Sequence, residues 1–158
     1  VQQYFRPIVQ WFHDNGIIFD DANYIPFYFV YAALRGPLRR RLYEGRNVLI
    51  ATHCSGDREA AIRKTLKTEG AHSSQFLQLS RDRSFYDTLD LTAVKQPVDL
   101  ALIGGGIGAV NILYQMQPLE IPAIDAGFII ECLANPKRVS ERTFCWPDAE
   151  RHGDYSPI

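Results

Sequence analysis

VDLALIGGGIGAVNILYQMQPLEIPAIDAGFIIECL, residues 98–133, is the stretch that decides the fold of this chain. It holds an apolar run, a glycine-rich turn from Gly104 to Gly108, a run compatible with a helix, and a second apolar run that ends at Asp125. Apolar runs broken by glycine in this way predict a strand, a tight turn, a helix and a second strand.

The glycine-rich turn predicts a phosphate site. Glycine allows the backbone N–H groups to come close to a ligand, and the helix that follows points its partially positive end at the same place. We therefore expect Gly104, Gly105, Gly106 and Gly108 to hold a phosphate or a nucleotide. The turn also fits the alanine variant of the dinucleotide fingerprint. A tight connection without a ligand is the alternative interpretation.

Short apolar runs alternate with helical patterns through the middle of the chain. Strands are predicted at 48–52, 75–79, 100–103 and 121–124, and helices at 57–69, 84–94 and 109–116. Alternation of this kind favours right-handed crossovers and a parallel sheet. The expected fold class is α/β, a Rossmann-like open parallel sheet in which the four strands are neighbours, preceded by a helical, aromatic-rich N-terminal segment.

The chain divides into three predicted segments. They are a helical, aromatic-rich cap at 1–45 with helices at 26–34 and 38–43, a Rossmann-like nucleotide-binding core at 46–134, and a C-terminal extension at 135–158 with a strand or an extended arm at 141–147. The aromatic residues of the cap are most simply explained as core, because aromatic side chains dominate buried surface.

Composition excludes several classes of protein. The chain has 158 residues, is 46% hydrophobic and carries a net charge of −1, which fits one globular core and indicates no nucleic-acid partner. It has no apolar run of about 18 residues, so no membrane span is expected. Cys54, Cys132 and Cys145 are widely spaced, which favours reduced thiols and a cytoplasmic location. Assembly into a homo-oligomer is left open.

The turn after the first predicted strand is a second candidate for phosphate binding. Open α/β sheets bind ligands at the carboxyl ends of their strands. Ser55 and Gly56 follow such an end and can donate N–H groups to a phosphate, and Ser55 is also the expected N-cap of the next helix. Only three residues separate Cys54 from Arg58, too few for the phosphate loop of cysteine phosphatases.

Asp125 is the acid best placed for catalysis or for metal binding. A divalent cation on a diphosphate takes one or two carboxylates, and the strand end delivers Asp125 to the crevice. Its alternative role is to cap the turn at 126–128. A separate basic cluster can either clamp phosphates or form a solvated helix face. Its members are Arg35, Arg39, Arg40, Arg41 and Arg46.

The motif LALIGGGIGAVNILYQMQPLEIPAIDAGFIIE, together with the strand at 46–52 and the segment at 73–87, resembles the C-terminal half of GT-D-type bacterial glycosyltransferases. The resemblance covers residues 46–133, and Asp125-Ala126-Gly127 matches the family's Asp-x-Gly strand end. It implies transfer of a sugar from a nucleotide-sugar donor to an acceptor hydroxyl, with a divalent metal ion, Mn²⁺ or Mg²⁺, at the site.

Two other functions stay open. The family's acidic Asp-x-Glu motif belongs to the N-terminal half, and residues 1–46 of this chain lack it. The domain is therefore also interpreted as a non-catalytic module that binds a nucleotide or metabolite. The third reading is an enzyme that uses NAD or S-adenosylmethionine. All three readings share a small-molecule ligand.

Overall fold

The computed structural model describes residues 39–141 except Gln96, together with residues 10, 14, 16, 30 and 33–36; at 139–141 it describes the backbone alone. Most of the predicted cap and of the predicted C-terminal extension, including the arm at 141–147, lies outside these residues. The short helix predicted at 38–43 is present as α3, Arg39–Tyr43.

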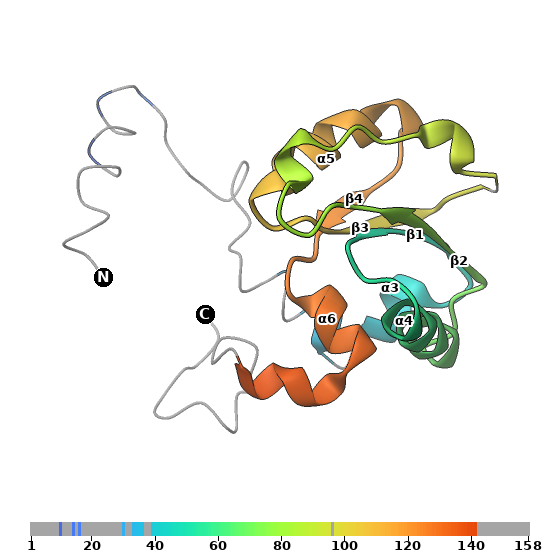
Figure 1. The fold of residues 1–158 in the computed structure, drawn as a ribbon. Coiled ribbons are helices and arrows are strands. Elements are labelled where there is room, and N and C mark those ends of the chain that lie inside the picture. Colours follow the sequence, from blue (N-terminus) through green and yellow to red (C-terminus); the bar gives the residue numbers. More distant parts are fainter. Residues whose placement is uncertain are drawn as a thin grey trace.

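Four parallel strands form the centre of the domain (Figure 1). They are β1 at Asn47–Thr52, β2 at Ser73–Gln78, β3 at Leu100–Gly104 and β4 at Ala123–Asp125. Their order across the sheet is β2-β1-β3-β4, and every neighbouring pair is parallel. The prediction of an α/β, Rossmann-like parallel sheet is confirmed, with the last strand starting two residues later than expected.

Helices cover both faces of this sheet (Figure 1). The longer ones are α4 at Asp57–Thr68, α5 at Ala109–Met116 and α6 at Ile129–Ala134. From β1 the chain moves outward to β2, whereas from β3 it moves to β4 in the opposite direction. Because crossovers between parallel strands are right-handed, opposite directions place α4 and α5 on opposite faces. Helices α3 and α6 lie on the α4 side.

The central strand β1 separates two hydrophobic cores. Val48 and Ile50 belong to the core beneath α4 and α6, and Leu49 and Ala51 belong to the core beneath α5. None of these four side chains is more than 1% exposed. Successive side chains of a strand point to opposite faces, so a strand covered on both sides reads as an unbroken apolar run.

The start of α4 differs from the sequence prediction. Gly56, and not Ser55, is the N-cap residue, and no side chain caps the helix. Gly56 has φ 58° and ψ −126°, a conformation that glycine adopts readily and other residues do not. The chain therefore turns at Gly56. At the other end the prediction holds: the helix stops before Gly70, where the Ala71 N–H donates to the Leu66 carbonyl at 3.0 Å.

The prediction of a helix at 84–94 is wrong. The chain forms two short 3₁₀ turns instead, η1 at Ser84–Tyr86 and η2 at Leu91–Ala93. The Asp87 carboxylate accepts both the N–H and the O–H of Ser80 at 2.6 Å, and the Asp90 carboxylate accepts the Thr92 N–H at 3.0 Å. Such side-chain bonds to nearby groups compete with helical backbone bonds, so the segment becomes a connection packed on α5.

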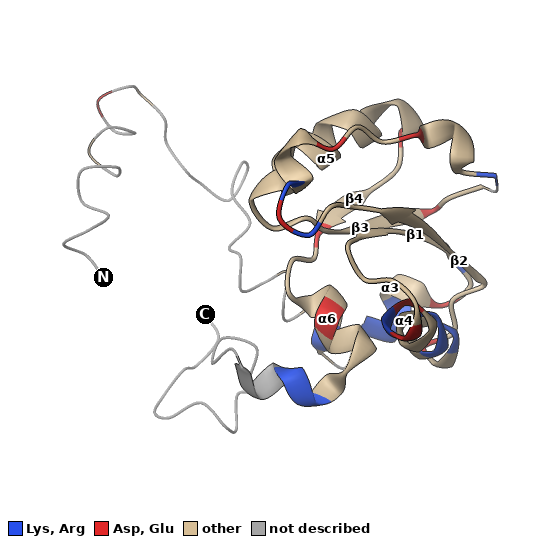
Figure 2. Ribbon diagram, viewed as in Figure 1, with Lys and Arg blue, Asp and Glu red and all other residues tan. Residues whose placement is uncertain are grey.

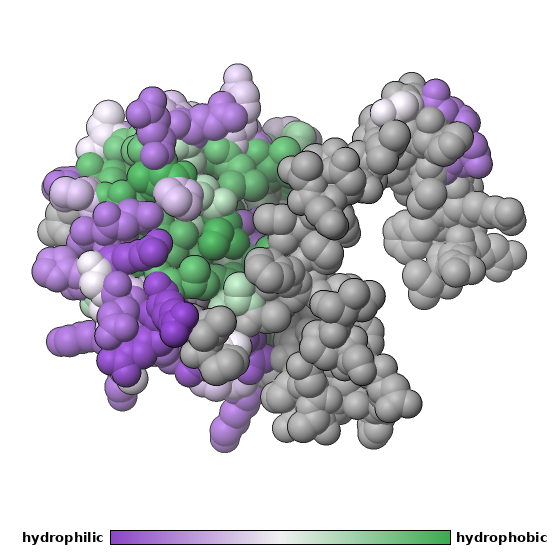
Figure 3. Space-filling view, turned by 180° about the vertical axis from the view of Figure 1, so that it is seen from behind, coloured by the Kyte–Doolittle hydropathy of each residue, from purple (hydrophilic) through white to green (hydrophobic). Residues whose placement is uncertain are grey.

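Charged and apolar side chains are unevenly spread over the surface. Lys and Arg gather on α3 and α4 (Figure 2), and an apolar area reaches the surface on the far side of the domain (Figure 3). Among the described residues no helix is both long enough and apolar enough to cross a bilayer.

Gly108 fixes the connection at 84–86 against the start of α5. A Cβ atom added at Gly108 would lie 2.5 Å from backbone atoms of Ser84 and Phe85. The Ser84 hydroxyl donates to the Gly105 carbonyl at 2.7 Å, and the Asn111 amide donates to the Phe85 carbonyl at 2.9 Å. The backbone of the connection thus rests directly on the backbone of the glycine-rich turn.

Gly108→Ala should lower the free energy of unfolding by about 1–3 kcal/mol, because the added methyl group forces two backbone segments apart. Val110→Ala is the control on the same helix: its side chain is 74% exposed, so its loss should change stability by no more than about 0.5 kcal/mol. Chemical denaturation of both variants gives the comparison, and a Gly108→Ala protein as stable as the wild type would contradict the close contact.

Candidate functional site

The strand order reverses direction between β1 and β3. The chain leaves β1 toward β2, returns across the sheet to β3 and continues to β4. At such a switch point the connections after two neighbouring strands turn to opposite faces, and a crevice opens between them. Thr52 pairs with Gly104 in the parallel register, so the turns at 53–57 and 105–108 both start at the same edge of the sheet, as the sequence predicts.

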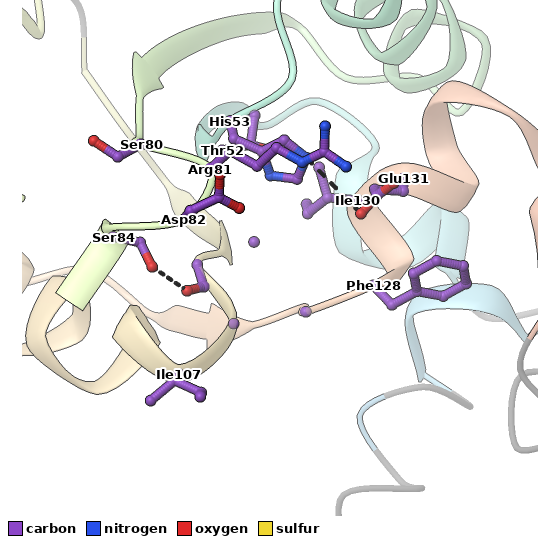
Figure 4. A pocket seen from close by; sticks show the side chains of 14 residues that line it. Thr52, His53, Ser80, Arg81, Asp82, Ser84, Ile107, Phe128, Ile130 and Glu131 are labelled. Atoms are coloured by element: carbon purple, nitrogen blue, oxygen red, sulfur yellow. Dashed lines mark hydrogen bonds and ion pairs between the residues drawn. The ribbon is translucent and has the colours of Figure 1, made fainter.

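A cavity of about 320 Å³ lies at this switch point (Figure 4). Its volume falls within the range of small-molecule pockets. The lining comes from the carboxyl ends of all four strands. The contributing segments are 52–53 after β1, 80–84 after β2, 104–107 after β3 and 127–131 after β4.

Three of the predicted glycines line the cavity, namely Gly104, Gly105 and Gly106. Gly106 has φ +53°, and a Cβ atom added there would meet nothing within 4 Å. Its backbone is therefore open to a ligand, and only glycine holds this conformation without strain. Gly108 is not among the lining residues and is covered by Ser84 and Phe85; its part in phosphate binding stays a prediction.

The remaining predicted residues lie beside the cavity. Ser55 and Gly56 are exposed in the turn before α4, and neither is among the lining residues. The Asp125 carboxylate, also outside the lining, accepts the Gly127 N–H at 3.0 Å and so caps its own turn. Partial burial raises the pKa of Asp125, and the Gly127 hydrogen bond opposes that rise. A catalytic role for Asp125 stays a prediction.

The β2–β3 connection supplies lining residues that the sequence prediction missed. Arg81, Asp82 and Ser84 follow the end of β2 and face the cavity (Figure 4). The signal was present, because these polar residues follow a predicted strand just as the glycine-rich turn does.

His53 is a neutral imidazole at pH 7. Burial lowers its pKa, and the positive charges of Arg81 and Arg58 lower it further, while Asp82 acts in the opposite direction. Its Nε2 lies 3.9 Å from Oε1 of Glu131, which is a polar contact and not a full ion pair when the ring is neutral. A neutral imidazole in a cavity can accept a proton from a bound hydroxyl group.

Glu131 and Arg138 close the side of the cavity formed by α6. The two side chains form an ion pair, and the Arg138 guanidinium lies 5.0 Å from the centre of the Phe128 ring. A cation in this position is attracted to the face of the ring. Phe128 and Glu131 both line the cavity, so Arg138 holds one apolar and one acidic wall residue in place.

The arginine cluster does not reach this site. Arg39 binds Glu69, with Nη2 2.7 Å from Oε1, and Arg40 binds Glu44 at 3.3 Å. The Arg46 carbonyl accepts the His72 N–H at the start of β2. These contacts place Arg39, Arg40 and Arg46 at the amino edge of the sheet, opposite the cavity. Of these, Arg39 joins α3 to the end of α4.

Comparison with protein-family models, curated proteins and solved structures gives no match to this chain. The fold and the site define an α/β domain with a cavity at the switch point of its sheet. In the part of the chain that the structure describes, no three or more His, Cys, Asp or Glu side chains form a group able to hold a metal ion by themselves.

The environment of His53 is testable by NMR. Its pKa should lie below the ordinary value of about 6.5, and Arg81→Gln should raise it because a neighbouring positive charge is removed. Arg63→Gln is the control, since the Arg63 guanidinium lies over Phe76, 4.4 Å from the ring centre. A His53 pKa that does not respond to Arg81→Gln would contradict the arrangement.

The same residue links stability to pH. Because the folded protein lowers the pKa of His53, the unfolded chain takes up this proton first as the pH falls. Stability is therefore lost as the pH drops through and below about 6.5. His53→Gln should lose less stability than the wild type over this interval, which denaturation at several pH values will show. Equal losses in the two proteins would contradict the lowered pKa.

Proposed function

We propose that this domain binds a nucleotide sugar by its diphosphate and transfers the sugar to an acceptor hydroxyl. The observation that carries the proposal is the cavity at the switch point, with open glycine backbone on one wall and Arg81 on another. A ligand with a diphosphate matches both walls, because backbone N–H groups and guanidinium groups are the usual partners of phosphate oxygens.

The diphosphate would lie on the turn between β3 and α5. Gly106 has no side chain to hold it away, and its Cβ direction is open. The following helix adds its positive end. Arg81 would approach from the β2 side and donate two hydrogen bonds at once. Since the Ser84 hydroxyl is committed to the Gly105 carbonyl, its role is to shape the turn.

The nucleoside would use the apolar parts of the lining. Ile107 and Phe128 both line the cavity, and Ile107 is 90% exposed. An exposed isoleucine and an aromatic ring, at separate places in the lining (Figure 4), offer contact area to a base or a ribose, and pockets commonly combine such surface with a few polar groups.

The chemistry needs a proton acceptor and stabilisation of the leaving group. The acceptor oxygen bonds to the anomeric carbon as the bond from that carbon to the diphosphate breaks, and the diphosphate leaves with the electron pair. His53 would take the hydroxyl proton. Arg81 would stabilise the charge that develops. Asp82 is the lining carboxylate that would help to hold Mn²⁺ or Mg²⁺ against the phosphates, and such an ion would supply further charge.

A binding module without turnover is the second candidate. Two acids near the cavity already have partners, since Glu131 pairs with Arg138 and Asp125 accepts the Gly127 N–H. Such a module would use the same diphosphate contacts, so binding tests the shared part of both proposals and transfer separates them. NAD and S-adenosylmethionine, the cofactors of the third interpretation, should be titrated in the same binding experiment.

A cytoplasmic location of the protein remains a prediction.

Binding can be mapped on the whole chain by NMR titration with UDP and UDP-glucose, with and without Mn²⁺. The amide signals of 52–53, 80–84 and 104–107 should shift. Gly106→Val should weaken binding at least tenfold, because a β-branched side chain blocks the close approach of the diphosphate. A Cβ atom at Gly106 meets no neighbour, but the φ of +53° strains a valine there, so the amide spectrum of the variant has to show the folded sheet before its affinity is compared.

Charge variants give the matched comparison. Arg81→Gln should weaken UDP binding about tenfold, the loss expected when one charge-assisted contact of about 1.4 kcal/mol is removed. Arg41→Gln removes the same charge from an exposed position on α3 and should leave affinity unchanged. Shifts confined to other parts of the chain, or UDP binding that survives Gly106→Val, would refute the proposal.

A further inference from the structure

A second cavity of about 480 Å³ opens on the opposite side of Glu131. Its walls are the first turns of α4, with Asp57, Arg58 and Ala61, and the end of α6 with the residues after it. Glu131 lines both cavities, so this one side chain belongs to the wall between them. None of the functions considered above uses the second cavity.

Five of the seven residues that line the second cavity are polar or charged, and their charges balance. Two acids, Asp57 and Glu131, face two bases, Arg58 and Arg138. Asn135 adds an amide, and Ala61 and Ala134 add small apolar surface. Equal numbers of positive and negative groups give no net attraction to an anion or a cation. A neutral ligand with many hydrogen-bonding groups therefore fits best.

Carbohydrates have the required chemistry. Neighbouring hydroxyl groups both donate and accept hydrogen bonds, so a carboxylate can accept from two of them, while guanidinium and amide groups donate to the others. Small alanine side chains leave room for the ring. Since this cavity adjoins the proposed donor cavity, a sugar bound in it would hold a hydroxyl close to the group that is transferred.

We infer that the cavity between α4 and α6 is a binding site for a neutral carbohydrate, which serves as the acceptor. The acceptor role rests on the proposed transferase function, whereas sugar binding does not. Glu131, at the boundary, is a positioning residue: it contacts His53 and pairs with Arg138, so it holds that guanidinium at the wall of the second cavity. The two ligands would thus occupy neighbouring cavities that are accessible separately.

Ala61→Leu is the sharpest test, because it fills the second cavity without any change of charge. Ala60→Leu is the matched control, since Ala60 is exposed on the same helix and does not line the cavity. Glucose, galactose and N-acetylglucosamine are titrated at millimolar concentration into the labelled full chain. At least one sugar should shift the amide signals of 57–61 and 134–135. Ala61→Leu should weaken that binding at least fivefold, and Ala60→Leu should not.

UDP binding, followed in the same samples, keeps the two proposals apart. UDP affinity should stay within twofold of the wild type in Ala61→Leu. If no sugar shifts the signals of 57–61 and 134–135, or if Ala61→Leu binds sugar as the wild type does, the second site is refuted whatever UDP does. If the sugar binds there and UDP binds nowhere, the carbohydrate site stands and its role as acceptor site is refuted.

Discussion

The parallel pairing of β1 with β3 is the constraint on which the site depends. It sets Thr52 beside Gly104, so that the two chain segments leave the sheet at the same edge. The register cannot slip by one residue, because Val48 and Leu49 would then exchange cores. Because crossovers between parallel strands are right-handed, the connections that follow β1 and β3 lie on opposite faces of the sheet. The crevice between them follows from sheet topology and needs no dedicated element.

Much of this arrangement can be predicted from the sequence, because it depends on local patterns. The apolar run before Gly104 is buried on both faces and could only be a central strand. A Cβ atom at Gly106 would meet no neighbouring residue, so the positive φ, and not close packing, explains why glycine stands at this position. The turn before α4 was harder to predict. Ser55 is a residue type typical of an N-cap, yet the backbone at Gly56 turns the chain into α4 without a side-chain cap.

The walls of the cavity could not be predicted in the same way, since they come from segments far apart in the chain. Whether Arg81 and Glu131 lie near Gly105 depends on how the β2–β3 connection and α6 pack. The composition of the connection predicts a helix. Its course is set instead by aspartate side chains that bind neighbouring backbone groups and by contact with Gly108, which no local pattern shows.

The β2–β3 connection is anchored on both sides of its lining residues Arg81 and Asp82. Ser80 is held by Asp87, and Ser84 is held by the Gly105 carbonyl. Residues 81–83 between these anchors are exposed and belong to no strand or helix. Substitutions there can alter the charge of the cavity without disturbing the sheet. The charge of the cavity is therefore set in part by two exposed side chains of a short connection, whereas its glycine wall is set by the sheet.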